Sequence, residues 1–539
     1  MATLDDAVSL KIKLQSGSLP LELSMLTLEQ IGPSLGEAIR QKGLYAASIG
    51  LLAIFGCMFA VYRLYLGLIA NISLSIILAL NVGLLSIAQY IFGNPIYATA
   101  GFTLTLPGIA ALILTIGMSA DACILFFEEM INLRDQWRSS PWKKVYSSVI
   151  NVSWSNVKKV ILDANVTTLI SALIIIWLGS GTISGFAIVL CIGIVATVYV
   201  SYFIVKELLL ILWNTGEPRY YLKYLESPQF KIFTNRRILV LISVIAVVLS
   251  IGFILTKGFK IGTDFTEGTH ITIRSSETLS TEKIESLFGN AGLPAIVQNI
   301  GANEMMNRKF TIKTSVLDVS QLSSIFNTLK TGLNGNIEFE DTSTMGASIT
   351  RKQAFKSVLV IFAALFAMLV YAALRYNFIR GFSTVVALCH DVIVVLGVCS
   401  IFNIEMSLFA VASILTLIGY SINDSIVLLA EIKIQEVQHI TAKQKSKKDL
   451  TFKELTINEF MDRAINKIFG RSVMTAFTTL LPVIPILAMG KTGLSDFAWI
   501  IFVGVIVGAW STLVVVAPII KNNVDKTINP HKPEIALES

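Results

Sequence analysis

Two stretches of this sequence decide its fold because they repeat each other: residues 116–121 read IGMSAD, and residues 418–424 read IGYSIND. Each places an aspartate, Asp121 or Asp424, inside a long apolar run. Further matches keep the same order in both halves of the chain: Gly32–Pro33–Ser34 with Gly346–Ala347–Ser348, Thr167–Thr168–Leu169 with Thr478–Thr479–Leu480, and Phe186–Ala187 and Gly193 with Phe497–Ala498 and Gly504. A five-helix unit is therefore predicted to occur twice in the same orientation, as in transporters built from parallel repeats.

The composition indicates a protein whose solvent is mainly lipid. The chain has 539 residues, of which 54% are hydrophobic and 15% charged, and its mean hydropathy is +0.70. Soluble domains carry about 25% charged residues, and about 20 apolar residues are needed to cross a bilayer. About eleven spans are predicted, at residues 43–62, 66–90, 103–127, 160–179, 183–213, 237–256, 354–374, 379–402, 405–430, 468–489 and 496–520.

The basic residues lie mainly in alternate loops. About six Lys and Arg fall between Arg134 and Lys159, six between Lys206 and Arg237, and nine between Lys433 and Arg471, whereas residues 91–102 contain none. This bias follows the positive-inside rule, so residues 1–42 and 257–352 are expected outside and the C-terminal tail inside. The net charge of +7 is then explained by topology and by anionic lipid headgroups, and no nucleic-acid partner is expected.

Seven segments are expected along the chain. They are an external N-terminal piece at 1–42, a first membrane block at 43–213, a cytoplasmic linker at 214–236, a single span at 237–256, an external domain at 257–352, a second membrane block at 353–520 and a cytoplasmic tail at 521–539. Within the external domain, strand-like and helix-like stretches alternate in the order β-α-β-β-α-β, which is typical of a ferredoxin-like fold. The fold class is thus an all-α polytopic membrane protein with a small α+β ferredoxin-like external domain.

The two aspartates of the repeat are the main candidate functional residues. Ionisable side chains cost several kcal/mol in hydrocarbon and usually have a function there. The repeat aligns Asp121 with Asn423, so Asp424 lies about 100° of helix rotation further on. Burial favours the neutral form of a carboxyl group, which suits a proton carrier at the interface of two halves. The alternative is that each aspartate only hydrogen-bonds a neighbouring helix.

Three further sites carry candidate charged residues. Asp163 is either a water-exposed helix start or a functional group of the fourth span. His390 and Asp391 form a pair able to relay protons, although adjacent helical residues point about 100° apart. Arg471 is either a flanking positive charge or a counter-ion that reaches a carboxylate near the midplane.

No catalytic motif and no metal-ligand spacing is recognised. The five cysteines lie within predicted spans and are interpreted as apolar packing residues. Neither an enzymatic activity nor a cofactor or metal is expected. The energy for any transport then comes from an ion gradient or from a partner.

The longest motifs resemble the SecD/SecF protein-export family over residues 10–520. Residues 105–122 resemble the fourth span of SecD, 161–169 its fifth span, 262–269 the signature that follows the first SecF span, and 390–392 and 418–425 the third and fourth spans of SecF. This resemblance implies membership of a proton-driven transporter superfamily that includes multidrug exporters. It also implies a bacterial inner-membrane protein that assists the Sec translocon.

The resemblance assigns roles to particular residues. The proton-relay positions of the family fall on Asp121, Asp424 and Arg471, and also on Asp163, whereas Asp391 is a candidate from its location alone. The signature turn is expected at Gly262, Asp264, Phe265, Gly268 and Thr269. The implied partners are the SecYEG translocon, SecA, an unfolded polypeptide in transit, and membrane lipid.

The sequence departs from the family pattern at its start and in the signature. The opening SecD span and its large external domain are missing, and residues 8–31 resemble only the end of that domain. Either a separate chain supplies these parts or the sequence is a fragment. Glu267 replaces a glycine, which removes access to positive φ at that position.

Three functions are compared. The first is a Sec accessory subunit driven by protons or sodium ions, since carboxylates serve either ion. The second is a translocon scaffold that does not transport. The third is a small-molecule or lipid exporter, which requires large external domains in both halves.

Overall fold

The computed structural model describes residues 27–31, 33–92, 106–136, 141–178, 182–212, 230–275, 280–290, 292–301, 308–315, 319–333, 337–446, 455–488 and 493–528. The chain divides into two compact units, one made of Met1–Ala38 with Thr263–Ala354 and the other of Ile39–Gly262 with Phe355–Ser539. The remnant was predicted at 8–31, the linker at 214–236 and the tail at 521–539; of these, residues 8–26, 214–229 and 529–539 lie outside the described residues.

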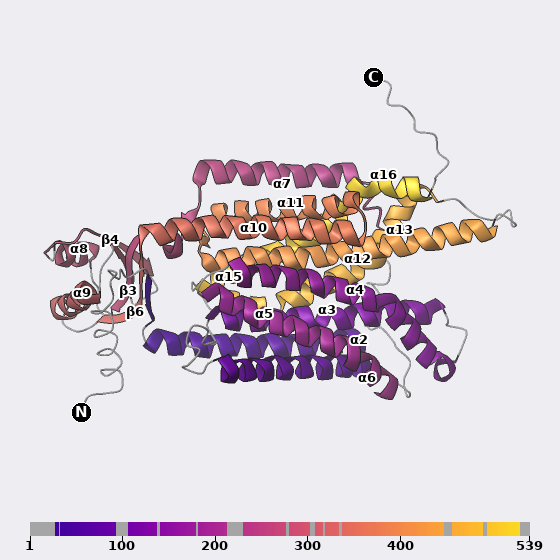
Figure 1. Cartoon of the computed structure of the whole chain (residues 1–539), viewed down its shortest axis with the longest axis horizontal. Helices are drawn as coiled ribbons and strands as arrows, with labels where there is room; N and C mark the ends of the chain where they lie inside the picture. The colour runs from indigo at the N-terminus through magenta and orange to yellow at the C-terminus, as the bar shows by residue number, and fades with distance from the viewer. Residues whose placement is uncertain are drawn as a thin grey trace, which may run out of the picture. The chain divides into compact units, whose positions relative to one another are not determined.

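The larger unit is a bundle of long apolar helices that lie side by side (Figure 1). Its first half contains α2 (Pro33–Phe92), α3 (Leu106–Gln136), α4 (Trp142–Leu178), α5 (Thr182–Tyr199), the π-helix η2 (Val200–Ile204) and α6 (Val205–Leu212). Its second half contains α7 (Arg236–Lys257), α10 (Ala347–Arg375), α11 (Phe378–Phe402), α12 (Leu408–Ser446), α13 (Ile457–Leu480), α14 (Val483–Ala488), α15 (Gly493–Ser511), η5 (Thr512–Val516) and α16 (Ala517–Ile528).

The described residues hold ten helical stretches that are long and apolar enough to cross a membrane. The first of them, within α2, reverses its direction at Arg63, where φ is 57°. The Asn71 side-chain amide donates to the Phe55 carbonyl at 3.2 Å, although a straight helix would separate these residues by about 24 Å. Helix α2 therefore consists of two antiparallel limbs, and its break lies between the spans predicted at 43–62 and 66–90.

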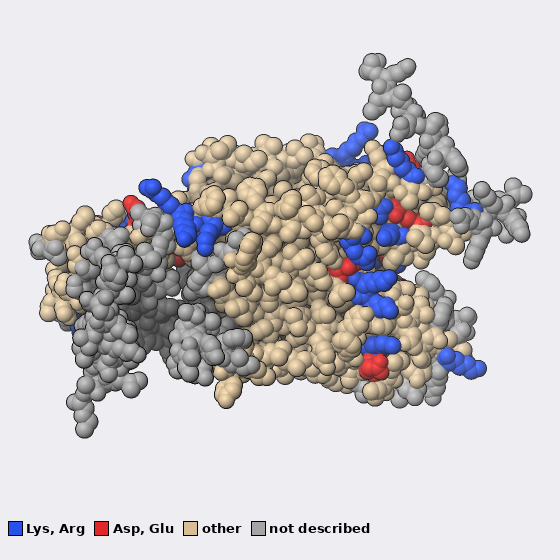
Figure 2. Space-filling view, in the orientation of Figure 1, with Lys and Arg blue, Asp and Glu red and all other residues tan. Residues whose placement is uncertain are grey.

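The surface of this unit fits a lipid environment. On the face shown in Figure 2, charged side chains lie towards the two ends of the bundle and leave a broad uncharged band between them. Large apolar side chains are exposed along this unit, including Ile238 (65%) and Leu255 (80%) on α7 and Phe362 (65%) and Leu374 (84%) on α10. Exposed apolar surface on this scale needs a non-aqueous partner, and the protein is a multi-pass membrane protein.

The two halves repeat each other and pack through equivalent residues. A side chain at Gly117 on α3 would place its Cβ 3.1 Å from the Cα of Thr479, and one at Gly419 on α12 would place its Cβ 3.3 Å from the Cα of Thr168. Gly117 matches Gly419 in the repeat, and Thr168 matches Thr479. Each half thus inserts its central helix against the other half in the same way, and the small residue allows the close approach.

One pair of repeat mates meets directly where the halves face each other. The rings of Phe186 on α5 and Phe497 on α15 lie 5.6 Å apart in an edge-to-face arrangement. Only residues on a pseudo-two-fold axis can contact their own mates, so these rings mark the axis.

The smaller unit is a five-stranded antiparallel sheet with two helices. Its strands follow the order β1-β6-β3-β5-β4 across the sheet. The elements are β1 (Thr27–Ile31), η4 (Thr263–Phe265), β3 (Gly268–Ser275), α8 (Thr281–Asn290), β4 (Ala295–Gly301), β5 (Arg308–Thr314), α9 (Val319–Gly332) and β6 (Ile337–Met345). From β3 to β6 the order is the predicted β-α-β-β-α-β. Ile271, Phe310 and Ile312 of the sheet pack against Phe288 of α8 and Ile325 of α9.

Strand β1 corrects the expected division of the chain. Residues 1–42 were expected to be a piece separate from the domain at 257–352. Instead β1 pairs with β6 as an antiparallel edge strand, from Thr27 opposite Met345 to Ile31 opposite Asp341. A strand of five residues whose partner lies some 310 positions away leaves too short a local pattern to be recognised.

Candidate functional site

The repeat aspartates and the arginine come together between the two membrane blocks. Asp121 lies on α3 of the first half, Asp424 on α12 of the second and Arg471 on α13. All three are buried, with exposed fractions of 7%, 2% and 5%. Each is therefore carried by a helix that contacts the other membrane block.

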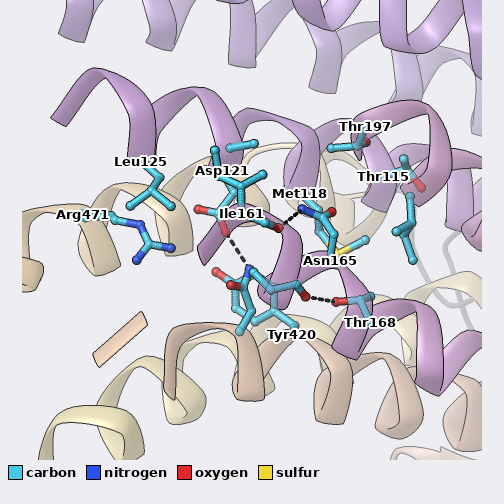
Figure 3. A pocket seen from close by; sticks show the side chains of 14 residues that line it. Thr115, Met118, Asp121, Leu125, Ile161, Asn165, Thr168, Thr197, Tyr420 and Arg471 are labelled. Atoms are coloured by element: carbon cyan, nitrogen blue, oxygen red, sulfur yellow. Dashed lines mark hydrogen bonds between the residues drawn. The ribbon is translucent and has the colours of Figure 1, made fainter. Parts of the chain in front are cut away.

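A small polar cavity adjoins this group (Figure 3). It offers about 30 Å³ to the centres of water molecules, and one water needs about 10–15 Å³ on this measure. Helices α3, α4, α5, α12 and α13 line it, and its polar side chains are Thr115, Asp121, Asn165, Thr168, Thr197, Tyr420, Asn423 and Arg471. The cavity therefore has room for about two waters next to Asp121.

Asp121 is held from the opposite half by its own repeat mate. The Asn423 side-chain amide donates to Asp121 Oδ2 at 2.9 Å, the bond drawn from Asp121 in Figure 3. Asp121 Oδ1, Asp424 Oδ2 and the Nε and Nη1 of Arg471 are buried without a hydrogen-bond partner. Unpaired buried polar atoms cost about 1–3 kcal/mol each, so this group can take up a proton, a water or a small cation.

The charges of the group are unbalanced when both carboxylates are ionised. The Arg471 guanidinium interacts electrostatically with Asp121 and with Asp424, and the two carboxylates repel each other. No direct ion pair joins Arg471 to either carboxylate. Two negative charges and one positive charge leave a net charge of −1, so one bound proton makes the group neutral.

The Asp163 side chain does not line this cavity. It is 7% exposed on α4, accepts a hydrogen bond from the Tyr371 hydroxyl at 3.0 Å, and pairs with Arg375 Nε at 2.7 Å. Both partners lie on α10. The reading of Asp163 as a water-exposed helix start is wrong, because Asp163 is buried in the middle of α4 and a partly buried ion pair connects it to the second half.

His390 and Asp391 form a separate buried cluster. His390 Nδ1 lies 3.0 Å from Asp391 Oδ1, although adjacent helical residues usually diverge. The hydroxyls of Ser421 on α12 and Ser511 on α15 donate to Asp391 Oδ2 at 2.6 and 2.9 Å. His390 Nε2 is buried without a partner. Ser421 lies one turn before Asp424 on α12, so the cluster adjoins the central group along that helix.

The signature residues are divided between the two units. The backbone N–H of Gly262 donates to the Met406 carbonyl at 2.9 Å, where β2 (Lys260–Ile261) pairs with β7 (Glu405–Met406). Asp264 and Phe265 belong to η4.

In the smaller unit, Gly268 has a φ of 121° and a Cβ there would lie 2.5 Å from the Thr314 carbonyl oxygen. The Thr269 hydroxyl lies 3.0 Å from that of Thr344. The positive φ thus falls on Gly268 and not on Glu267, so the change to glutamate is tolerated.

These features define a class: a multi-pass membrane protein with two parallel repeats and ionisable groups buried where the repeats meet. The model of the C-terminal part of the protein-export membrane proteins SecD and SecF matches residues 13–215 and 325–526. This chain belongs to the SecD/SecF protein-export family.

Several relatives share almost the whole chain. The SecDF translocase subunit of Thermus thermophilus is 32% identical over 523 residues, which are 96% of this chain and 66% of that protein. The Bacillus subtilis SecDF is 26% identical over 96% of this chain and 68% of its own length. The crystal structure of the translocon-associated SecDF from Thermus thermophilus superposes with a TM-score of 0.79 at 31% identity and covers 96% of this chain and 67% of that one. The chain thus spans about two thirds of these relatives.

Proposed function

We propose that this chain is a Sec accessory subunit that uses an ion gradient to promote protein translocation across the membrane. One observation carries the proposal: Asp121 from the first repeat meets Asn423 of the second, beside Asp424 and Arg471, in a buried group that one proton neutralises. The relatives support the translocation part, because they are named protein translocase subunits.

The expected mechanism couples charge to the position of the two halves. When the group carries its net negative charge, burial between the halves is unfavourable and an opened, hydrated interface is favoured. When a proton binds, the neutral group tolerates a closed interface. Alternate protonation from the two sides of the membrane thus drives one repeat against the other, and the chain acts as a transporter and not as an enzyme.

The proposed topology has eleven crossings, since the two limbs of α2 each cross once. The C-terminus is placed in the cytoplasm of a bacterial cell, and the sheet unit, which we assign to the ferredoxin-like fold, is placed outside the inner membrane. The proposed partners are the SecYEG translocon with SecA, an unfolded polypeptide and lipid.

The test is preprotein translocation into inverted membrane vesicles that contain the translocon and this chain, with the ion gradient intact or collapsed. Asp121→Asn is expected to remove the gradient-dependent part of translocation. Asp135→Asn, an exposed aspartate further along α3, is the matched control and is expected to behave as wild type.

The other two candidate functions give different results in the same assay. A scaffold would stimulate translocation equally in wild type and Asp121→Asn. An exporter of the same superfamily would leave translocation unchanged in both, and either result would refute the proposal.

A further inference from the structure

Asp121 and Asn423 occupy the same position in the two repeats, and they contact each other. Their spacing of 302 residues is also the spacing of Gly117 and Gly419. Like the Phe186–Phe497 pair, they therefore lie on the pseudo-two-fold axis. A strictly symmetric pair there would be two acids or two amides, whereas this chain has one of each.

An amide is suited to both protonation states of a carboxyl group. An ionised carboxylate only accepts hydrogen bonds, a protonated one also donates, and a primary amide presents a donor on one side and an acceptor on the other. In the structure Asn423 Nδ2 donates to Asp121 Oδ2. Asn423 Oδ1 and Asp121 Oδ1 are both buried and have no partner. The atoms needed for the second state are therefore present and unused.

The surroundings do not offer a second group of this kind to Asp121. Helix α12 brings Asp424 and Tyr420 towards it, and α13 brings Arg471. From α4 and α5 the cavity receives only uncharged side chains: Ile161, Ala164, Asn165, Thr168, Ile194 and Thr197. The Asn165 amide is already bonded to the Ile161 carbonyl of its own helix at 2.8 Å.

We propose that Asn423 is a positioning residue that follows the protonation state of Asp121. Its N–H donates to the ionised carboxylate, and after a half-turn of the amide its Oδ1 accepts the O–H of the protonated acid. The proton is bound as an O–H on Asp121 Oδ1 or Oδ2, that O–H bond breaks when the proton leaves to the cavity, and no bond between heavy atoms changes. Because Asn423 belongs to α12, each protonation event in the first repeat alters a contact of the second.

This inference rests on the proposed ion-driven function, and the test separates the two. Proton uptake is measured with a pH-sensitive dye in proteoliposomes that contain the full chain, over a range of external pH. If wild type takes up no protons, the proposed function fails. If wild type is active, the variants at Asn423 decide the inference.

Asn423→Asp has nearly the same shape but places two carboxyl groups in contact, and such a pair holds one shared proton tightly. The pH of half-maximal uptake is expected to rise by about one unit or more. Asn423→Leu removes the hydrogen bond to the ionised Asp121 and the one proposed for the protonated acid. It is expected to lower the maximal rate at least about tenfold. An unchanged pH midpoint and rate in both variants would overturn the inference.

Asn156→Asp is the matched control. The Asn156 amide also donates to a carboxylate, Glu129 Oε1 at 2.7 Å, but at an exposed position. It receives the same chemical change and is expected to keep the wild-type midpoint. An equal shift in this control would show that any added carboxylate has the effect, which overturns the role of Asn423.

If Asn423→Asp does not assemble, the exchange Asp121→Asn with Asn423→Asp carries the test. It keeps one acid opposite one amide on the axis. The exchange is expected to regain uptake that Asp121→Asn alone lacks, and no recovery would overturn the inference.

Discussion

Removing the charge of Arg471 tests the balance of the buried group. Arg471 is 5% exposed and interacts with both Asp121 and Asp424. No ion pair within 4.0 Å joins its nitrogens to the oxygens of either carboxylate, so these atoms lie more than 4.0 Å apart. At an effective dielectric constant of about 20, unit charges at 4 Å attract by about 4 kcal/mol. Each attraction is therefore below about 4 kcal/mol, or about three pH units.

The sign of the effect follows from the charges. The guanidinium stabilises the ionised carboxylates, so Arg471→Leu favours their protonated forms and the proton is held to higher pH. The pH of half-maximal proton uptake in proteoliposomes is expected to rise by about one to three units, with slower turnover because release is impaired. Arg471→Lys keeps the charge and is expected to shift the midpoint less.

Arg463→Leu is the control, because Arg463 lies on the same helix but is exposed. It is expected to keep the wild-type profile. An Arg471→Leu variant that assembles normally and has the wild-type midpoint would refute the charge argument.

Three further changes test other parts of the structure. Asp163→Asn breaks the pair with Arg375. It is expected to destabilise the protein by about 1–3 kcal/mol, less than for a fully buried pair because Arg375 is partly exposed, and ion uptake is expected to persist. A stable variant without uptake would place Asp163 in the relay. Gly268→Ala, at a φ of 121°, is expected to lower the unfolding temperature of the sheet unit, whereas Gly289→Ala meets open space and is expected not to lower it. At the start of α8, the backbone N–H of Glu282 hydrogen-bonds its own carboxylate and holds the pKa of that carboxyl below the usual value. The ionised carboxylate therefore stabilises the fold above the unfolded-state pKa, and this stabilisation is lost as pH falls through the folded-state pKa. Glu282→Gln is expected to flatten this loss of thermal stability on the acid side, and an unchanged loss would contradict the argument.

The repeat in the sequence predicted a large part of the site. The matched motifs placed Asp121 and Asp424 at similar depth in equivalent helices, and hydropathy showed that both would be buried. The same alignment set Asn423 opposite Asp121, a signal for their contact that was not used. Residues on a pseudo-two-fold axis meet their own mates, but the sequence does not say which positions lie on the axis.

Contacts between distant helices were not predictable. Asp163 lies 212 residues from Arg375, and no local pattern connects them. His390 and Asp391 were predicted to be a pair able to relay protons, although adjacent helical side chains point about 100° apart. In the structure His390 Nδ1 nevertheless lies 3.0 Å from Asp391 Oδ1. Strand β1 was missed because its hydrogen-bond partner is in β6.

Ion uptake by sealed proteoliposomes tests the central claim most directly, namely that the two membrane blocks form one ion-binding site. Wild type, Asp121→Asn, Asp424→Asn and the exposed control Asp135→Asn are compared with a pH-sensitive dye and with a sodium indicator. The account predicts gradient-driven uptake of one ion in wild type and in the control, and none in either buried variant although both assemble. Equal uptake in all four proteins would contradict it.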